Sequence, residues 1–218
     1  MAKSSRKKLI VAGCSFTHGA GTHDPYMHER NIELSYSQYI ADQLGCKNHN
    51  IAMSACSNDW IFHRTLDAIM QGGNIHSVIV CWTYSARLTW RCDGNIYNLH
   101  PTMFCAHKDP INFQTFYDGD APEGTLIRAE TQQHADELSD MHPYMIRNMI
   151  DDAEFKENQK RYSKALQAFC KLPRNNIALF ETHPMNYIDI GTFHKESRHP
   201  NAEEHIAIGK KIMDQFYG

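Results

Sequence analysis

Four short runs along the chain have the length and composition of β-strands. They are predicted at residues 8–13, 48–53, 77–82 and 176–181. The first and third runs are almost wholly apolar, as expected of strands that are buried on both faces of a sheet. The chain between the runs therefore has to supply helices that cover both faces.

Apolar residues recur at helical spacing between these runs and after the last one. The predicted helices lie around 36–44, from a cap at 57–59 to about 71, at about 143–171, and from 201 to 217. Asn201 and Glu204 have the spacing of a capping box at the start of the last helix. That helix is expected to turn Ile206, Ile212 and Phe216 inward.

Strands that alternate with helices predict a three-layer α/β/α sandwich with a flavodoxin-like parallel sheet. With 218 residues, the chain is expected to form a single domain, 1–218. Periodicity is lost at about 91–140, which is interpreted as an irregular lid or specificity insert. In such sheets the active site lies beyond the carboxyl ends of the strands, which selects 14–15, 54–55, 83–85 and the segment after 181.

Composition narrows the possible partners. The 22 basic and 25 acidic residues give a net charge of -3, so no nucleic-acid partner is expected. Seven cysteines without a Cys-x-x-Cys pair and 14 histidines without zinc-ligand spacing predict buried thiols, no metal site and no cofactor. The apolar run before Cys14 is too short for a secretory signal, and no membrane span is found, so a cytoplasmic location is expected.

Ser15 directly follows the first predicted strand and Gly13. A serine at such a strand-to-helix turn can be a nucleophile, since backbone N–H groups there can hold an oxyanion. It then needs a base, because a hydroxyl alone attacks poorly near neutral pH. The alternative is that Ser15 is a turn or capping residue in a phosphate-binding loop.

His199 lies just before the last helix, three residues after Glu196. A histidine in this position could take the serine proton while the carboxylate holds its other ring nitrogen. The alternative is coincidence, because Glu-x-x-His pairs arise easily in a histidine-rich chain and His-Pro-Asn is ordinary helix-capping sequence.

Four segments, in order, resemble conserved blocks of the SGNH/GDSL hydrolase family. They are Gly13-Cys14-Ser15-Phe16-Thr17-His18-Gly19, residues 50–59, residues 78–85, and Glu196-Ser-Arg-His199-Pro-Asn201. The Gly-Cys-Ser-Phe-Thr opening is similar to small members carried by phages and bacteria. The resemblance implies a serine esterase with a Ser15–His199–Glu196 triad and an acyl-enzyme. Its substrate would be a small-molecule or carbohydrate ester, with acetyl as the first choice of acyl group.

The chain departs from the family pattern around the implied oxyanion hole. The hole would use the N–H groups of Ser15 and Ala55, where Ala55 stands in the place of a family glycine. The asparagine of the third block is absent, and Ser85 or Thr83 would supply a hydroxyl instead. Glu196 stands where the family usually has aspartate.

Four further residues lie at positions that could contact substrate. Asn58 could line the pocket or cap a helix, and Arg87 could bind a substrate carboxylate or pair with a surface acid. Trp82 and Tyr84 could stack on a sugar ring or pack at the rim of the core.

Two rival functions remain. The missing asparagine motivates a non-catalytic SGNH-like binding or structural module, for instance in a phage particle. A nucleotide-binding flavodoxin-like protein is the other, although the chain has neither a Gly-x-Gly-x-x-Gly nor a P-loop motif. The oligomeric state is left open.

Overall fold

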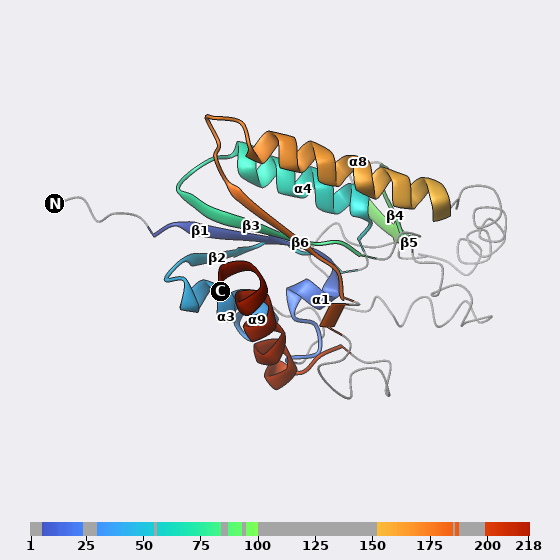
Figure 1. Ribbon diagram of the computed structural model, residues 1–218. Helices are drawn as coiled ribbons and strands as arrows, with labels where there is room; N and C mark the ends of the chain where they lie inside the picture. The colour runs from blue at the N-terminus through green and yellow to red at the C-terminus, as the bar shows by residue number, and fades with distance from the viewer. Residues whose placement is uncertain are drawn as a thin grey trace, which may run out of the picture.

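The computed structural model describes residues 6–23, 30–54, 56–83, 87–92, 95–99, 152–184, 186–187 and 199–218. Within them, four strands form one sheet in the order β2-β1-β3-β6 (Figure 1). The strands are β1 (Lys8–Ala12), β2 (Lys47–Asn50), β3 (Ile75–Cys81) and β6 (Ala178–Thr182). Each neighbouring pair runs parallel, which confirms the predicted parallel sheet.

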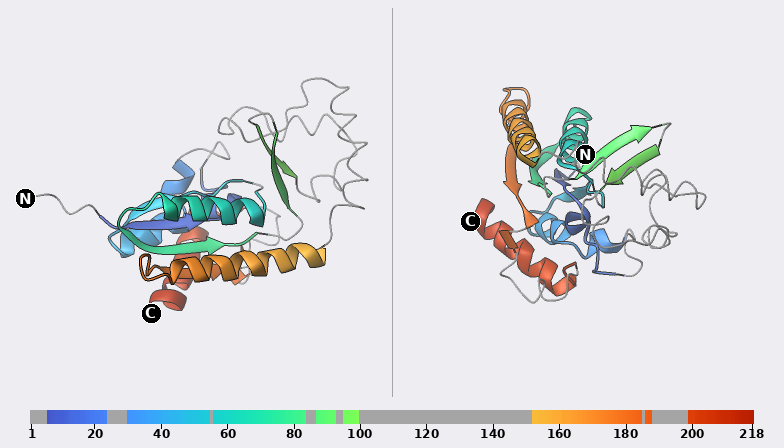
Figure 2. Two further views of the ribbon diagram at one scale, coloured as in Figure 1. Left: turned by 90° about the horizontal axis from the view of Figure 1, so that it is seen from above. Right: turned by 90° about the vertical axis from the view of Figure 1, so that its right-hand side faces the viewer.

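Helices cover both faces of this sheet, so the molecule has the three layers expected from the sequence (Figures 1 and 2). One face carries α4 (Asn58–Met70) and α8 (Asp152–Cys170), which pack on each other. The other face carries α1 (Ser15–His18), α3 (Tyr36–Gln43) and α9 (Ala202–Tyr217). A short helix, α2 (Arg30–Glu33), leads into α3.

The two central strands form the core of the sheet. Residues 9–12 of β1 and 78–81 of β3 are at most 1% exposed, as predicted for strands that are buried on both faces. Five cysteines of the described residues are free, buried thiols: Cys14, Cys46, Cys56, Cys81 and Cys170. Ser15, the candidate nucleophile, follows β1 and so lies at the end of a fully buried strand.

The edge strand β2 is shorter than predicted. It ends at Asn50 rather than at residue 53, and its residues are only partly buried or exposed. Asn48 and Asn50 both donate side-chain hydrogen bonds to the Ser37 hydroxyl on α3, at 3.0 and 2.9 Å. The polar edge is therefore held by α3 rather than by apolar packing on both faces.

In the last helix the predicted capping box is confirmed, but the predicted orientation of Ile206 is wrong. The Asn201 side chain accepts from the Glu204 N–H at 2.9 Å, and Glu204 accepts from the Asn201 N–H at 2.7 Å. Ile212 is fully buried, whereas Ile206 is 42% exposed, so its predicted inward orientation is wrong. Residues 205, 208, 209 and 212 form the buried face of α9. Ile206 lies one residue off that face, which turns it about 100° toward solvent.

After β3 the chain forms a hairpin that was not predicted from the sequence. It consists of β4 (Leu88–Cys92) and β5 (Asn95–Leu99), paired antiparallel (Figure 2). The insert predicted at 91–140 therefore begins as regular β-structure. Residues 100–151 lie outside the described residues, and so does the predicted start of α8 at 143.

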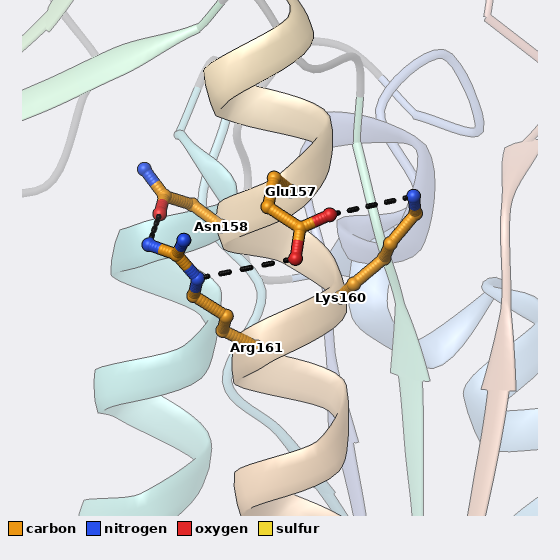
Figure 3. Close-up of polar contacts among 4 residues, drawn as sticks. All are labelled: Glu157, Asn158, Lys160 and Arg161. Carbon is orange, nitrogen blue, oxygen red and sulfur yellow. Dashed lines mark hydrogen bonds and ion pairs between the residues drawn. The ribbon is translucent and has the colours of Figure 1, made fainter.

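The outer surface of α8 is polar. Glu157 lies 3.5 Å from Lys160 and 4.0 Å from Arg161, and Asn158 accepts from Arg161 at 3.2 Å (Figure 3). These side chains are largely exposed, so water screens the pairs and they add little stability. Among the helices of the described ranges, none is both long and apolar enough to cross a membrane.

Candidate active site

The chain turns sharply where β1 ends, and Gly13 permits this turn. A Cβ on Gly13 would lie 2.1 Å from Thr17 Oγ1 and 3.1 Å from the Cys81 carbonyl oxygen. Only a residue without a side chain lets α1 fold back this closely against the strand exit. Ser15, the first residue of α1, is consequently held at the carboxyl end of the sheet and is only 5% exposed.

Ser15 and His199 meet at this edge although 184 positions separate them in the sequence. The Nε2 atom of His199 lies 2.8 Å from the Ser15 hydroxyl oxygen, within hydrogen-bond distance. With Nε2 unprotonated, the hydroxyl donates to it, which is the arrangement that a base needs to take the serine proton.

Burial sets the protonation state of this histidine. Burial and, as the smaller cause, the positive charge of Arg87 together lower the pKa of His199 to about 4. The imidazole is therefore neutral near pH 7, as a proton acceptor must be. The same Arg87 charge also lowers the pKa of His183, after burial as the main cause.

Asn58 fixes the end of β3 from the neighbouring helix. Its Oδ1 accepts from the Thr83 N–H at 2.8 Å, and its Nδ2 donates to the Thr83 carbonyl oxygen at 3.1 Å. The capping role belongs instead to Ser57, whose hydroxyl accepts from the Trp60 N–H at 3.2 Å. Asn58 is 5% exposed, so it is a structural clamp rather than a residue that lines an open pocket.

Thr83 is itself fully buried, and its hydroxyl has no hydrogen-bond partner among the described residues. A buried hydroxyl without a partner costs free energy, commonly about 1–3 kcal/mol. Thr83 follows the carboxyl end of β3, beside the exit of β1 where Ser15 lies. The Thr83 hydroxyl is therefore a buried polar group at the candidate site for which the described part of the chain supplies no partner.

Trp82 has the position of a core residue. It is 3% exposed, and its indole N–H donates to Glu181 Oε1 at 3.1 Å. This burial leaves no open ring face for a sugar, contrary to the stacking role considered from the sequence. Arg87 is partly buried beside the site. Four other predicted site residues lie outside the described residues: Ala55, Tyr84, Ser85 and Glu196.

Comparison with known proteins adds the following. No protein-family model and no curated protein matches the chain. Solved structures that are similar include a member of the G-D-S-L lipolytic family from Veillonella parvula, with 11% identity over 97% of this chain and 98% of that one, at a TM-score of 0.40. A carbohydrate acetylesterase from Sinorhizobium meliloti has 14% identity over 96% and 98%, at 0.42.

An acetyl xylan esterase from Butyrivibrio proteoclasticus is also similar, with 12% identity and a TM-score of 0.42. The alignment covers 98% of this chain and 64% of that one.

Two further histidines near the site are buried, and the second of them was missed by sequence reasoning. His18, in the same helix as Ser15, is 6% exposed. His205 is fully buried on α9, where its Nδ1 accepts from the Tyr36 N–H at 3.3 Å. Burial lowers the pKa of His205 to about 3. Its helical spacing with the buried Ile212 was the available sequence signal.

Proposed function

We propose that the protein is a serine esterase in which Ser15 is the nucleophile and His199 the general base. The observation that carries the proposal is the 2.8 Å contact between the Ser15 hydroxyl and His199 Nε2. Two features support it: the pair lies beyond the carboxyl ends of parallel strands, and burial keeps the imidazole neutral.

The proposed reaction has two half-reactions. In the first, Ser15 Oγ attacks the ester carbonyl carbon while His199 Nε2 takes the hydroxyl proton, and the imidazolium then gives that proton to the leaving alcohol. In the second, His199 deprotonates a water molecule that attacks the acyl-serine. The acid leaves, and the proton returns to Ser15 Oγ. We propose Glu196 as the residue that orients His199, as the sequence predicts.

The developing oxyanion needs donors, and Thr83 is the side chain that we propose for this task. Its buried hydroxyl has no partner among the described residues, and Asn58 holds its backbone on both sides. A donor that is unpaired at rest gains its hydrogen bond only when the oxyanion forms, which is the condition for lowering the barrier. The N–H groups of Ser15 and Ala55 complete the proposed hole.

For the substrate we propose a small acyl ester, with acetyl as the first choice of acyl group. A carbohydrate as the carrier of that group follows from the family resemblance alone. Neither the acyl pocket nor the carrier is needed for the test of the reaction itself.

Hydrolysis of p-nitrophenyl acetate by the purified protein tests the proposal. Wild type should hydrolyse the ester, and both Ser15→Ala and His199→Ala should lower kcat by at least about 10³-fold. His63→Ala is the matched control, because its side chain on α4 is 61% exposed. If a folded wild type hydrolyses no short-chain ester, the esterase proposal fails and a binding module takes its place.

A further inference from the structure

The chain makes a tight turn directly after the helix that carries Ser15. Gly19 caps α1 in the left-handed conformation, with φ at 92°. The Thr22 N–H donates to the Gly19 carbonyl oxygen at 3.1 Å, and the Thr22 hydroxyl donates to the same oxygen at 2.7 Å. Two hydrogen bonds thus close the turn formed by residues 19–22, which directly follows the helix that carries Ser15.

Both glycines of this turn touch neighbouring backbone. A Cβ on Gly19 would lie 2.3 Å from the Asn31 carbonyl oxygen, so this side of the turn rests on α2. A Cβ on Gly21 would lie 2.9 Å from His199 Cβ and 3.2 Å from the His199 carbonyl oxygen. The turn therefore fills the space between α2 and the residue proposed as the base.

We infer that Gly21 is a positioning residue, and that the turn of residues 19–22 is the seat that sets how closely His199 approaches Ser15. The inference rests on the proposed function. Ser15 and Gly21 are six positions apart in one hydrogen-bonded segment, so the nucleophile and the seat of its base move as one body. From the other side, the Asn201 capping box fixes the chain two residues after His199.

The absence of a side chain at Gly21 is what allows this close contact. A methyl group there would overlap His199 Cβ and push the segment away from the turn. An error of about 1 Å in the alignment of reacting groups can lower a rate by about 100-fold. Because the change affects the Ser15–His199 pair rather than a group that holds the ester, it should act on kcat and leave KM nearly unchanged.

Gly45 provides a matched control for Gly21→Ala. Both glycines have positive φ, 92° for Gly21 and 63° for Gly45, so an alanine is strained at either position. No heavy atom lies within 4 Å of a Cβ built on Gly45, whereas Gly21 meets His199. A loss that comes only from backbone strain should appear in both variants. A loss from the displaced base should appear in Gly21→Ala alone.

The test measures kcat and KM for p-nitrophenyl acetate and titrates His199 by NMR in both variants. Gly21→Ala should lower kcat at least about tenfold more than Gly45→Ala does, with similar KM values. The pKa of His199 should rise from about 4 toward 6.5 as the ring becomes less buried. Equal kcat and an unchanged His199 pKa in the two variants would overturn the inference.

If Gly21→Ala does not fold, a second variant tests the inference. Thr22→Val removes the 2.7 Å hydroxyl bond that closes the turn and adds no atom against His199. A several-fold lower kcat supports the seat, and a wild-type kcat contradicts it. The NMR titration needs no turnover, so it separates the two proposals. If wild type has no esterase activity, the proposed function fails while the pKa still reports whether Gly21 seats His199.

Discussion

The two ends of the parallel sheet differ in what they do with polar groups. At the amino end, a cleft of about 640 Å³ lies among Arg6, Lys8, Lys47 and neighbouring polar residues. At the carboxyl end, Ser15 and Thr83 are almost fully buried, and Ser15 lies in contact with His199. This cleft and the proposed reactive pair are thus at opposite ends of the sheet.

The comparison indicates that the proposed reactive end is marked by the alignment and burial of Ser15 and His199 and not by an open cleft. In the basic cleft, Asp42 accepts an exposed hydrogen bond from Gln38 at 2.8 Å, and the Lys8 ammonium donates to the Gly72 carbonyl oxygen at 3.5 Å. Water can solvate such groups, so their geometry need not be fixed by the protein. At the carboxyl end, burial lowers the pKa of the base and holds it against the hydroxyl.

Outside the Ser15–His199 pair, the largest effect is expected from Thr83→Val at the carboxyl end. If the hydroxyl serves the oxyanion, its removal should lower kcat by about 10²–10³-fold. The free energy of unfolding should stay equal or rise, since the hydroxyl has no described partner to lose. Ester hydrolysis and urea unfolding measure the two quantities.

Thr65→Val is the control for this threonine. The Thr65 hydroxyl donates to the Ile61 carbonyl oxygen at 2.6 Å within α4, away from the strand ends. Its removal should lower the free energy of unfolding by about 1 kcal/mol without changing kcat. A kcat for Thr83→Val within twofold of wild type would remove Thr83 from the oxyanion hole.

The pH dependence should show the burial of the base. His199 must be neutral to take a proton, and its pKa in the folded protein is lowered to about 4. The value of kcat/KM should therefore hold through pH 5 and fall tenfold per pH unit only below about pH 4. An acid limb near pH 6.5, the ordinary histidine value, would contradict a buried base.

Stability changes over the same window and has to be measured beside the rates. The folded pKa values of His199 and His205 lie below the unfolded value, so unfolded chains bind more protons between about pH 3 and 6.5. The two neutral histidines contribute fully to the free energy of unfolding above pH 6.5. Their contribution falls as the pH drops, by at most about 1.4 kcal/mol per pH unit for each histidine. Rates measured after only brief exposure to acid separate the loss of activity from the loss of stability. Thermal melting at each pH checks that the protein is still folded.

The smallest effect is expected at the amino end. Lys47→Ala removes an exposed side chain from the basic cleft. Both kcat/KM and the free energy of unfolding should stay close to wild type, the latter within about 0.5 kcal/mol. A tenfold loss of kcat/KM in this variant would mean that the reactive end has been assigned wrongly.

The central strands and the Ser15–His199 pair could be predicted from the sequence for different reasons. Apolar runs such as 8–13 report their own burial, because every residue in a central strand faces a covered side. The pair was predicted from a resemblance in the order of short motifs, which carries spatial information that local periodicity lacks. The capping box at Asn201 is a local signal and was also confirmed.

Pairings between elements could not be predicted in this way. The Asn58 amide bonds the Thr83 backbone across 25 positions, and nothing in either segment shows that they will meet. The hairpin of β4 and β5 was missed although the β4 sequence, Leu88–Cys92, alternates apolar and polar residues; its partner strand β5, Asn95–Leu99, does not alternate cleanly. Ile206 was placed inward because apolar character was read without the phase of the buried helix face.

Labelling with a fluorophosphonate probe, followed by peptide mass spectrometry, tests the central claim most directly. The probe reacts with a serine whose proton is being removed by a nearby base. The account predicts a single adduct on Ser15 in wild type and none in His199→Ala. Urea unfolding curves check that both proteins are folded. An adduct on another residue, or equal labelling of Ser15 without His199, would contradict it.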